Sequence, residues 1–419
     1  MCGIVGIYDT RQRPVDGAIL RRMTEVLGHR GPDDVGIWVD REIGFGHQRL
    51  AIRDLSEAGH QPMADRDGLV TVTFNGEIYN DADLRQRLTR EHGCVFSSTC
   101  DTEVIPAGYV AWGSSLFGML EGMFAIALWD SRDRSLTLAR DGAGIKPLFL
   151  SRSGTEVSFA SEIKALLQNP RQGRAINDGA LHTFFATGYA GPVATTLAGI
   201  EQVPPGTARR IDQSGISDRR FWQPARTPDI FRLSDALDAF GPLWKAVTAE
   251  MLVSDVPVGV LQSGGIDSSL VTMAVRGHEP KPRLFTAGYA ESTHDETDLA
   301  GTVARLSGLP HEVVPMGEDA RPAETFAAVV YHTDGQLADS SAYSTYRLFA
   351  VMRRHLKVVL AGDGADEFFG GYPTYRASRV AGFAGSVAPK ADWTASSQRE
   401  IKKERTRKLW LARLRELAR

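Results

Sequence analysis

The pattern of apolar runs changes once along the chain, and this change constrains the fold more than any other feature. Short β-like runs bounded by turn residues fill the first 220 residues: IVGIYD, residues 69–74, MFAIALWD, SLTLAR, PLFLS and VSFAS. From about residue 234 onward, long helical patterns alternate with short apolar strands such as VPVGVLQ and RLFTAGY. The change predicts two domains of different class.

The first region predicts an α+β domain dominated by antiparallel sheet. Helical stretches at about residues 16–27 and 82–91 would cover the sheets, and Asn80 or Asp81 would cap the second. In the second region, helical patterns at 234–252, 268–275 and 295–307 lie between the apolar runs. Such alternation predicts an α/β domain with a doubly wound parallel sheet. A length of 419 residues accommodates two or three domains.

The boundary between these regions follows a stretch rich in Pro and Gly, from about Gly191 to Arg226. We place it near residues 225 to 235, which gives domains at 1–225 and 230–419. The last residues, 398–419, carry nine Lys or Arg against three Glu, with apolar residues near helical spacing. They predict a basic amphipathic helix that packs on its own domain.

Composition argues against several classes of partner. Lys and Arg number 48 and Asp and Glu 51, so a net charge of −3 gives no general attraction to nucleic acid or to an anionic membrane. One long apolar stretch without charged residues, Val104 to Leu120, is interrupted by Pro106 and is too short to span a bilayer. The start, MCGIVGIYD, lacks the features of a secretory signal. We therefore expect a cytoplasmic protein with small-molecule partners.

Three cysteines are too few for a disulfide framework, and their spacing matches no zinc site. Cys2 follows Met1 directly, and an initiator methionine is normally removed when a small residue follows it. Removal would leave a free α-amine with an ordinary pKa of about 7.7–8.0, which can accept the thiol proton at neutral pH. Cys2 is then either a nucleophile that carries its own base or an inert cysteine, and the surrounding motifs decide.

Five motifs occur in order around this cysteine: CGIVG, HRGPD at residues 29–33, GHQRLAI, NGEIYN at residues 75–80, and CDTEV. With them the sequence resembles the glutamine amidotransferases of the N-terminal-nucleophile type, specifically the asparagine synthetase family. The resemblance implies an N-terminal-nucleophile (Ntn) hydrolase fold, an αββα sandwich, for the first domain. It also implies a glutamine-hydrolysing carbon–nitrogen ligase.

By this resemblance, Cys2 forms a thioester with glutamine, releases ammonia and is then hydrolysed. Asn75 and Gly76 supply the oxyanion hole, through a side-chain amide and a backbone N–H that a glycine lets approach closely. Further residues bind glutamine: Arg49 its carboxylate, Asp101 with Glu77 its ammonium group, and the backbone near Ile52 and Arg53 the rest of the pocket. The loop at residues 29–33 would close over the site.

The second domain contains VGVLQSGGIDSSLV, which predicts a strand, a turn with two glycines and a helix. Backbone N–H groups and the dipole at the start of a helix favour an anion. The motif lacks the GKS or GKT ending of the commoner nucleotide loop. It resembles the pyrophosphate loop of ATP pyrophosphatases, in domains like the adenine nucleotide alpha hydrolases, and would bind ATP through Ser263, Gly264, Gly265, Asp267, Ser268 and Ser269.

A second motif, AGDGADEFFGGY at residues 361–372, follows the apolar run VVL. The resemblance implies that Asp267 and Asp366 hold Mg²⁺ against the ATP phosphates. It places Leu261, Ala287, Ala361 and Gly362 at the adenosine, and gives the carboxylate of Asp363 a part in adenylation and in the attack of ammonia. His294 and His311 we expect to be structural.

The resemblance ends near residue 376: neither the arginine-rich acceptor segment nor the catalytic lysine of the family follows. We expect a Mg·ATP-dependent amidotransferase that passes ammonia through an internal channel to an adenylated carboxylate, by default that of aspartate. One alternative is the amidation of another carboxylic acid, because Gln262 and the missing C-terminal segment weaken the assignment of aspartate. The other is a truncated protein whose second half only binds nucleotide or a partner chain. A homodimer or a complementing C-terminal chain would also fit.

Overall fold

The computed structural model describes residues 1–225, 232–289 and 295–375. The chain divides into two units, Met1–Ala361 and Gly362–Arg419, which are described separately. The predicted connection after residue 225 lies largely on residues outside the described part, and the predicted basic helix at 398–419 lies there entirely. Both stay predictions.

The first unit opens with a six-stranded antiparallel sheet in the order β10-β8-β9-β1-β3-β2. All seven residues of its strand β1 are buried, and Gly3 pairs with Gln48 of β3, so the start of β1 lies beside the end of β3. The strands are β1 (Gly3–Asp9), β2 (Asp34–Asp40), β3 (Ile43–Arg49), β8 (Phe149–Ser153), β9 (Glu156–Ala160) and β10 (Ile200–Gln202).

A second six-stranded antiparallel sheet has the order β12-β11-β7-β6-β5-β4. Its long central pair, β5 and β6, runs in register from Val70 opposite Asp130 to Ile78 opposite Gly122. The strands are β4 (Met63–Ala64), β5 (Val70–Ile78), β6 (Gly122–Asp130), β7 (Ser135–Arg140), β11 (Thr207–Asp212) and β12 (Gly215–Arg220).

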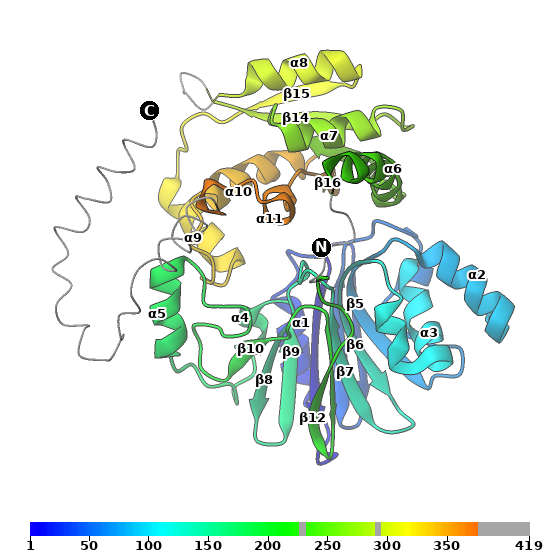
Figure 1. The fold of residues 1–419 in the computed structure, drawn as a ribbon. Coiled ribbons are helices and arrows are strands. Elements are labelled where there is room, and N and C mark those ends of the chain that lie inside the picture. Colours follow the sequence, from blue (N-terminus) through cyan, green and yellow to red (C-terminus); the bar gives the residue numbers. More distant parts are fainter. Residues whose placement is uncertain (226–231, 290–294, 376–419) are drawn as a thin grey trace, which may run out of the picture. The chain divides into compact units, whose positions relative to one another are not determined.

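The two sheets face each other across a shared apolar layer (Figure 1). Side chains from β1, β3, β8 and β9 meet those from β6, β7 and β11 there, among them Ile4, Phe45, Leu150, Phe159, Ala127, Trp129, Leu138 and Ile211. Tyr8 and Trp129 pack edge to face with ring centroids 5.2 Å apart. Because alternate residues of a strand point to opposite faces, the outer faces remain for helices.

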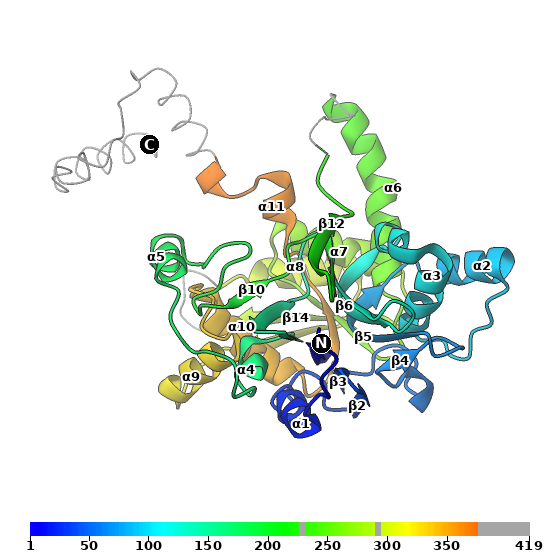
Figure 2. The same ribbon diagram turned by 90° about the horizontal axis from the view of Figure 1, so that it is seen from below.

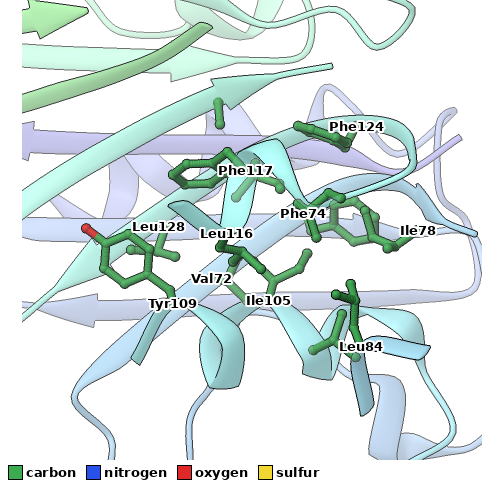
Figure 3. Packing of buried hydrophobic residues seen from close by; sticks show 14 of the residues in the cluster. Val72, Phe74, Ile78, Leu84, Ile105, Tyr109, Leu116, Phe117, Phe124 and Leu128 are labelled. Carbon is green, nitrogen blue, oxygen red and sulfur yellow. The ribbon is translucent and has the colours of Figure 1, made fainter. Parts of the chain in front are cut away.

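Helices cover both outer faces. On the first sheet lie α1 (Gly17–Glu25) and α4 (Ile163–Leu166). On the second sheet lie α2 (Asp81–His92) and α3 (Val104–Trp112), which both views place beside β5 and β6 (Figures 1 and 2). Figure 3 shows this outer layer, in which Leu84, Ile105 and Tyr109 pack on Val72 and Phe74. The predicted Ntn αββα sandwich is confirmed.

Smaller elements complete this half. They are α5 (Asp178–Thr187) and the short 3-10 helices η1 (Glu57–Gly59), η2 (Asp101–Glu103) and η3 (Gly113–Gly118). The expected cap of α2 is not formed. Asn80 lies at the N-cap position but makes no capping hydrogen bond, and its side chain instead binds the backbone of Met119 and Glu121. Asp16, in contrast, caps α1 through Ala18 and Ile19.

A third, parallel sheet follows in the order β15-β14-β13-β16. Its strands are β13 (Val258–Leu261), β14 (Arg283–Gly288), β15 (His311–Pro315) and β16 (Val358–Leu360), and its helices are α6 (Leu233–Met251), α7 (Ile266–Val275), α8 (Thr297–Ser307), α9 (Pro322–His332) and α10 (Ser341–Met352). Val260 and Leu284 pack with α7 and α8, whereas Phe285 packs with Met352 of α10. The predicted doubly wound sheet is confirmed.

The strand order of this sheet defines its ligand edge. The chain moves from β13 outward to β14 and β15, and then returns to the other side of β13 with β16. In open parallel sheets, ligands bind outside the carboxyl ends of the strands where the order reverses in this way. The SGGIDSS loop begins at that point, directly after β13.

The described residues of the second unit, 362–375, contain one helix, α11 (Ala365–Phe369). In the described part of the chain, no helix combines the length and the apolar character that crossing a membrane requires.

Candidate functional site

Cys2 lies just before β1, where the strand meets the end of β3. Its thiol lies between the two backbone groups of Leu50: the Leu50 N–H is 3.4 Å from Sγ and the Leu50 carbonyl oxygen 3.8 Å from it. The carbonyl oxygen of Cys2 accepts a hydrogen bond of 2.8 Å from Nε of Arg30. Burial raises the pKa of the thiol, so a base must assist before it can act as a nucleophile.

The end of β5 carries Asn75, Gly76 and Glu77. The Asn75 side chain is 1% exposed, and both its Nδ2 and its Oδ1 lack a hydrogen-bond partner. Buried amides are normally satisfied, so an unpaired one that lines a cavity is available for a ligand. A Cβ on Gly76 would lie 2.0 Å from the carbonyl oxygen of Met123, so packing against β6 by itself requires glycine here.

Arg49 is the last residue of β3 and is buried. Its Nη1 donates to the carbonyl oxygen of Ser56 at 2.8 Å, and its Nη2 donates to that of Asp54. These bonds hold the guanidinium in place and leave further N–H donors for an anion. Hydrogen bonds from Ser56 and Thr99 lower the pKa of Asp54 to about 2, so this carboxylate fixes the loop.

Asp101 begins η2 and accepts a hydrogen bond of 2.8 Å from the backbone N–H of Ile78. Burial raises the pKa of its carboxyl. Burial, and then the neighbouring Asp101, also raise the pKa of Glu77 to about 7. The two acids therefore lie close together, and the charges of Lys146 and Arg53 do not fully offset the effect of burial on Glu77. The Arg53 guanidinium pairs with Asp81, at 2.8 Å from its Nη2, and its charge also acts on Asp101 and Glu77.

All eight glutamine-site residues predicted from the sequence line one cavity of about 560 Å³, its open mouth included. These are Cys2, Arg49, Ile52, Arg53, Asn75, Gly76, Glu77 and Asp101. The cavity joins the end of β3, the end of β5, the start of β1 and η2, which are separated by up to 99 residues in sequence. Within the part of the chain that is described, the structure brings the whole predicted set together.

Lys146 also lines this cavity and is not among the residues predicted from the sequence. It is 7% exposed, and among the described residues none forms an ion pair with its ammonium group. Burial lowers its pKa. The sequence signal for this residue was its position between Ile145 and Pro147, at the edge of a predicted apolar strand.

The loop at residues 29–33 lies beside the cavity. His29 and Arg30 bind Glu162, at 3.1 and 2.8 Å, and Asp33 accepts the Ala51 N–H at 2.8 Å. A Cβ on Gly31 would lie 2.3 Å from the carbonyl oxygen of Gln48, which explains the glycine of HRGPD. That this loop closes over bound glutamine stays a prediction.

The SGGIDSS loop connects β13 to α7. Gly264 has a φ of +85°, and a Cβ there would lie 2.6 Å from Leu299 Cβ, so the loop requires glycine at this position. Ser263 and Ser268 join their hydroxyl groups at 3.0 Å, and Ser269 bonds back to Gly265. Backbone N–H groups in the first turn of an α-helix have no partner within the helix, so this turn offers them to an anion.

Leu261, Ala287 and Ala361 lie at the carboxyl ends of β13, β14 and β16, along the edge that carries this loop. His311 Nε2 lies 2.8 Å from the Thr286 hydroxyl, which agrees with the expected structural role. His294 lies outside the described residues. Gln262 is buried, with its Oε1 lacking a partner.

Gly362, Asp363 and Asp366 belong to the second unit, and Asp366 lies in α11. Asp267, the other residue of the predicted metal pair, belongs to the first unit. Neither carboxylate forms a hydrogen bond or ion pair among the described residues, and carboxylate oxygens suit Mg²⁺. Within the described ranges no group of three or more His, Cys, Asp or Glu side chains could hold a metal. The pair stays a prediction.

Comparisons with known proteins agree with this geometry. The family model of the glutamine amidotransferase domain matches residues 1–222, and that of asparagine synthase matches residues 242–419. The second match extends beyond residue 376, where the resemblance was expected to end. Asparagine synthetase [glutamine-hydrolyzing] 1 of Bacillus subtilis is 34% identical over 386 residues, which cover 90% of this chain and 60% of that protein.

Two further relatives have similar identities to this chain. A putative asparagine synthetase [glutamine-hydrolyzing] 2 of Methanocaldococcus jannaschii is 31% identical over 403 residues, covering 90% of this chain and 76% of the relative. Amidase chyE of Penicillium rubens is 32% identical over 381 residues, covering 85% of this chain and 55% of the relative. The chain thus spans about 60% of the length of the Bacillus relative. By the two family models and the identity to these relatives, the chain belongs to the family of glutamine-hydrolysing asparagine synthetases.

Proposed function

We propose that this protein hydrolyses glutamine at Cys2 and transfers the ammonia to a carboxylic acid that ATP has activated. The observation that carries the first half is the cavity around Cys2. An unpaired buried amide, a buried arginine at the end of β3 and two adjacent acids line it. These groups match the oxyanion, the carboxylate and the ammonium group of a reacting glutamine.

The α-amine of Cys2 would act as the base once Met1 is removed. Burial lowers the pKa of the Met1 amine to about 5, so this part of the molecule favours a neutral amine at physiological pH. The neutral amine takes the thiol proton and Sγ attacks the amide carbon. The amine then gives this proton to the amide nitrogen, and the carbon–nitrogen bond breaks to release ammonia. Water then hydrolyses the thioester to glutamate. Asn75 would stabilise the oxyanion, a kind of contact worth about 3 kcal/mol of barrier.

ATP would bind at the SGGIDSS loop, where its phosphates face the start of α7. The acceptor carboxylate attacks the α-phosphate, pyrophosphate leaves, and ammonia displaces AMP from the acyl-adenylate. Asp267 and Asp366 would hold Mg²⁺, which neutralises charge on the phosphates. Asp363 would assist the adenylation and amidation steps.

A second cavity supports internal passage of ammonia. It has a volume of about 1350 Å³, with solvent at its mouth included. Met1, Arg30 and Leu50 border it from the glutaminase region, and Tyr346 and Phe349 of α10 border it from the region of the parallel sheet. Leu50 also contacts the thiol of Cys2, so this cavity begins beside the nucleophile.

Aspartate is the proposed acceptor, in line with the names of the asparagine synthetases among the relatives. The test is the stoichiometry of glutamate and AMP per turnover, measured with aspartate and with a panel of other carboxylic acids. One AMP per amide formed, with aspartate alone, supports the proposal. The same ratio with a different acid would replace aspartate, and glutamate release without AMP across the panel would remove the ligase step.

A further inference from the structure

A chain of buried charges begins at the main chain of Cys2 and ends far along the sequence. Arg30 donates to the Cys2 carbonyl oxygen through Nε and pairs with Glu162 through Nη1, both at 2.8 Å. Lys164 pairs with the other oxygen of Glu162. Its ammonium nitrogen also lies 2.9 Å from Oδ1 of Asp334. We call these four charged side chains the Asp334 network.

Asp334 comes from the turn between α9 and α10, in the region of the parallel sheet, and reaches the start of α4. Its Oδ2 accepts the backbone N–H of Ile163 at 2.6 Å, and its Oδ1 accepts that of Lys164 at 3.2 Å. The adjacent Tyr331 places its ring 4.8 Å from the ammonium nitrogen of Lys164. Gln336 forms two hydrogen bonds with Thr196, at 2.7 and 3.1 Å. The turn is thus fixed to the glutaminase region at several points.

All four side chains of the Asp334 network are at least nine-tenths buried. Two cations and two carboxylates balance, so loss of one carboxylate leaves an uncompensated buried positive charge. Hydrogen bonding by His29 and the charges of Arg30 and Lys164 outweigh burial and lower the pKa of Glu162 to about 2. Burial raises the pKa of Asp334, so its charge depends on Lys164 and the two backbone donors.

Such networks are poor sources of stability, because apolar side chains of similar volume usually pack as well. What the Asp334 network does provide is a fixed position for Arg30, and through Arg30 for the carbonyl group of Cys2. The thiol itself contacts the backbone of Leu50, at 3.4 Å from the nitrogen and 3.8 Å from the carbonyl oxygen. A displacement of about 1 Å at a reacting atom can lower a rate by about a hundredfold.

We propose that Asp334 is a positioning residue for glutamine hydrolysis: from the turn between α9 and α10 it completes the buried network that holds the Cys2 main chain in place. This inference rests on the proposed glutaminase function. It makes the glutamine site dependent on a residue of the region that carries the nucleotide loop. Asp334 touches neither glutamine nor the thiol.

The test measures kcat and KM for glutamine hydrolysis by the full chain. Asp334→Asn keeps oxygen and size but removes the charge, and we expect kcat to fall about tenfold with KM within about twofold, because Arg49 and Asp101 still recognise glutamine. Lys164→Met should lower kcat similarly, whereas Lys164→Arg keeps the cation and should retain most of it. In the double variant Asp334→Asn/Lys164→Met the two losses of kcat should not add, because both substitutions break the same ion pair.

Asp130→Asn is the matched control. Asp130 is also a buried carboxylate that accepts a backbone N–H, from Arg132 at 3.0 Å, and pairs with that arginine at 2.7 Å. It lies at the end of β6 remote from Met123, which lines the cavity, so kcat should stay at the wild-type value. Thermal unfolding checks the fold; if Asp334→Asn does not fold, the two Lys164 variants carry the test.

Three results would overturn the inference. They are a kcat of Asp334→Asn no lower than that of Asp130→Asn, a change confined to KM, or fully additive losses in the double variant. Wild-type protein that hydrolyses no glutamine would instead overturn the proposed function, and the inference with it. The two failures are therefore distinguishable in one series of assays.

Discussion

At the scale of single residues, the cavity around Cys2 is lined by polar groups, some of which folding leaves without partners. Asn75 has neither donor nor acceptor satisfied, and Lys146 has no ion pair among the described residues. Glu77 and Asp101 both have a raised pKa, chiefly through burial. Burying such groups costs free energy unless something pairs with them. A bound amino acid would supply that pairing.

Glu77 gives this site a pH dependence. Its pKa of about 7 lies above the ordinary value of 4.5, so ionising it destabilises the empty folded protein as the pH rises through that interval. Only the ionised form can pair with an ammonium group. We expect glutamine to bind about tenfold more weakly at pH 6 than at pH 8.

Calorimetry with the Cys2→Ala variant measures this affinity without hydrolysis. Adding Glu77→Gln should weaken binding at pH 8 and remove most of the difference between the two pH values. An affinity that is independent of pH while Glu77 is present would contradict the assigned role.

At the scale of elements, close approach between neighbouring strands fixes the positions of the site residues. Gly76 of β5 meets the backbone of β6, where a Cβ would lie 2.0 Å from the carbonyl oxygen of Met123 and 2.8 Å from Phe124 Cα. Backbone atoms in the middle of a sheet cannot yield as a flexible side chain can. The glycine is therefore a requirement of the β5–β6 pair, in addition to any role at the oxyanion.

Gly76→Ala should destabilise the protein by about 1–3 kcal/mol and reduce glutaminase activity by more than tenfold, because β5 must move away from β6. Thermal denaturation and a glutaminase assay measure the two effects. Gly17→Ala is the control: no atom lies within 4 Å of its Cβ position in α1, so stability should not decrease. Equal stability of the two variants would contradict the steric argument.

At the scale of the whole molecule, the glutaminase residues and the pyrophosphate-type loop belong to different sheets. Cys2 precedes β1 of an antiparallel sheet, and Asp267 lies in the first turn of α7 beside the parallel sheet. A substitution at one of these sites should therefore abolish one proposed step, glutamine hydrolysis or AMP formation, and leave the other. The proposed passage of ammonia is what would connect them.

Two substitutions should therefore give opposite losses. Cys2→Ala should abolish glutamine hydrolysis but leave AMP formation driven by added ammonium. Asp267→Asn should lower AMP formation by more than tenfold and leave basal glutaminase, because it weakens the metal that neutralises the phosphates. Assays of glutamate and AMP for both variants, with glutamine or ammonium as nitrogen source, check this. Equal loss of both activities in either variant would argue against separate sites.

Several parts of this molecule could be predicted from sequence because they depend on short-range patterns. The strands at 123–130 and 135–140 and the helices near 16–27 and 295–307 follow from local periodicity, and the structure contains them with small shifts. The region of β2 and β3, residues 34–49, was not predicted as a hairpin. Its glycine-rich sequence, IGFGHQR in β3, carries little alternation, and its burial comes from neighbouring layers.

The sequence by itself determined the two domain classes, the glycines of the loops and the identity of eight cavity residues, Cys2 among them, because motifs and periodicity are local properties of the chain. Only the tertiary structure decided that these eight residues share one cavity, that Lys146 joins them, and that Asp334 reaches the support of Cys2. Pairing between residues hundreds of positions apart depends on how sheets stack and which charges become buried, and no short stretch of sequence records that.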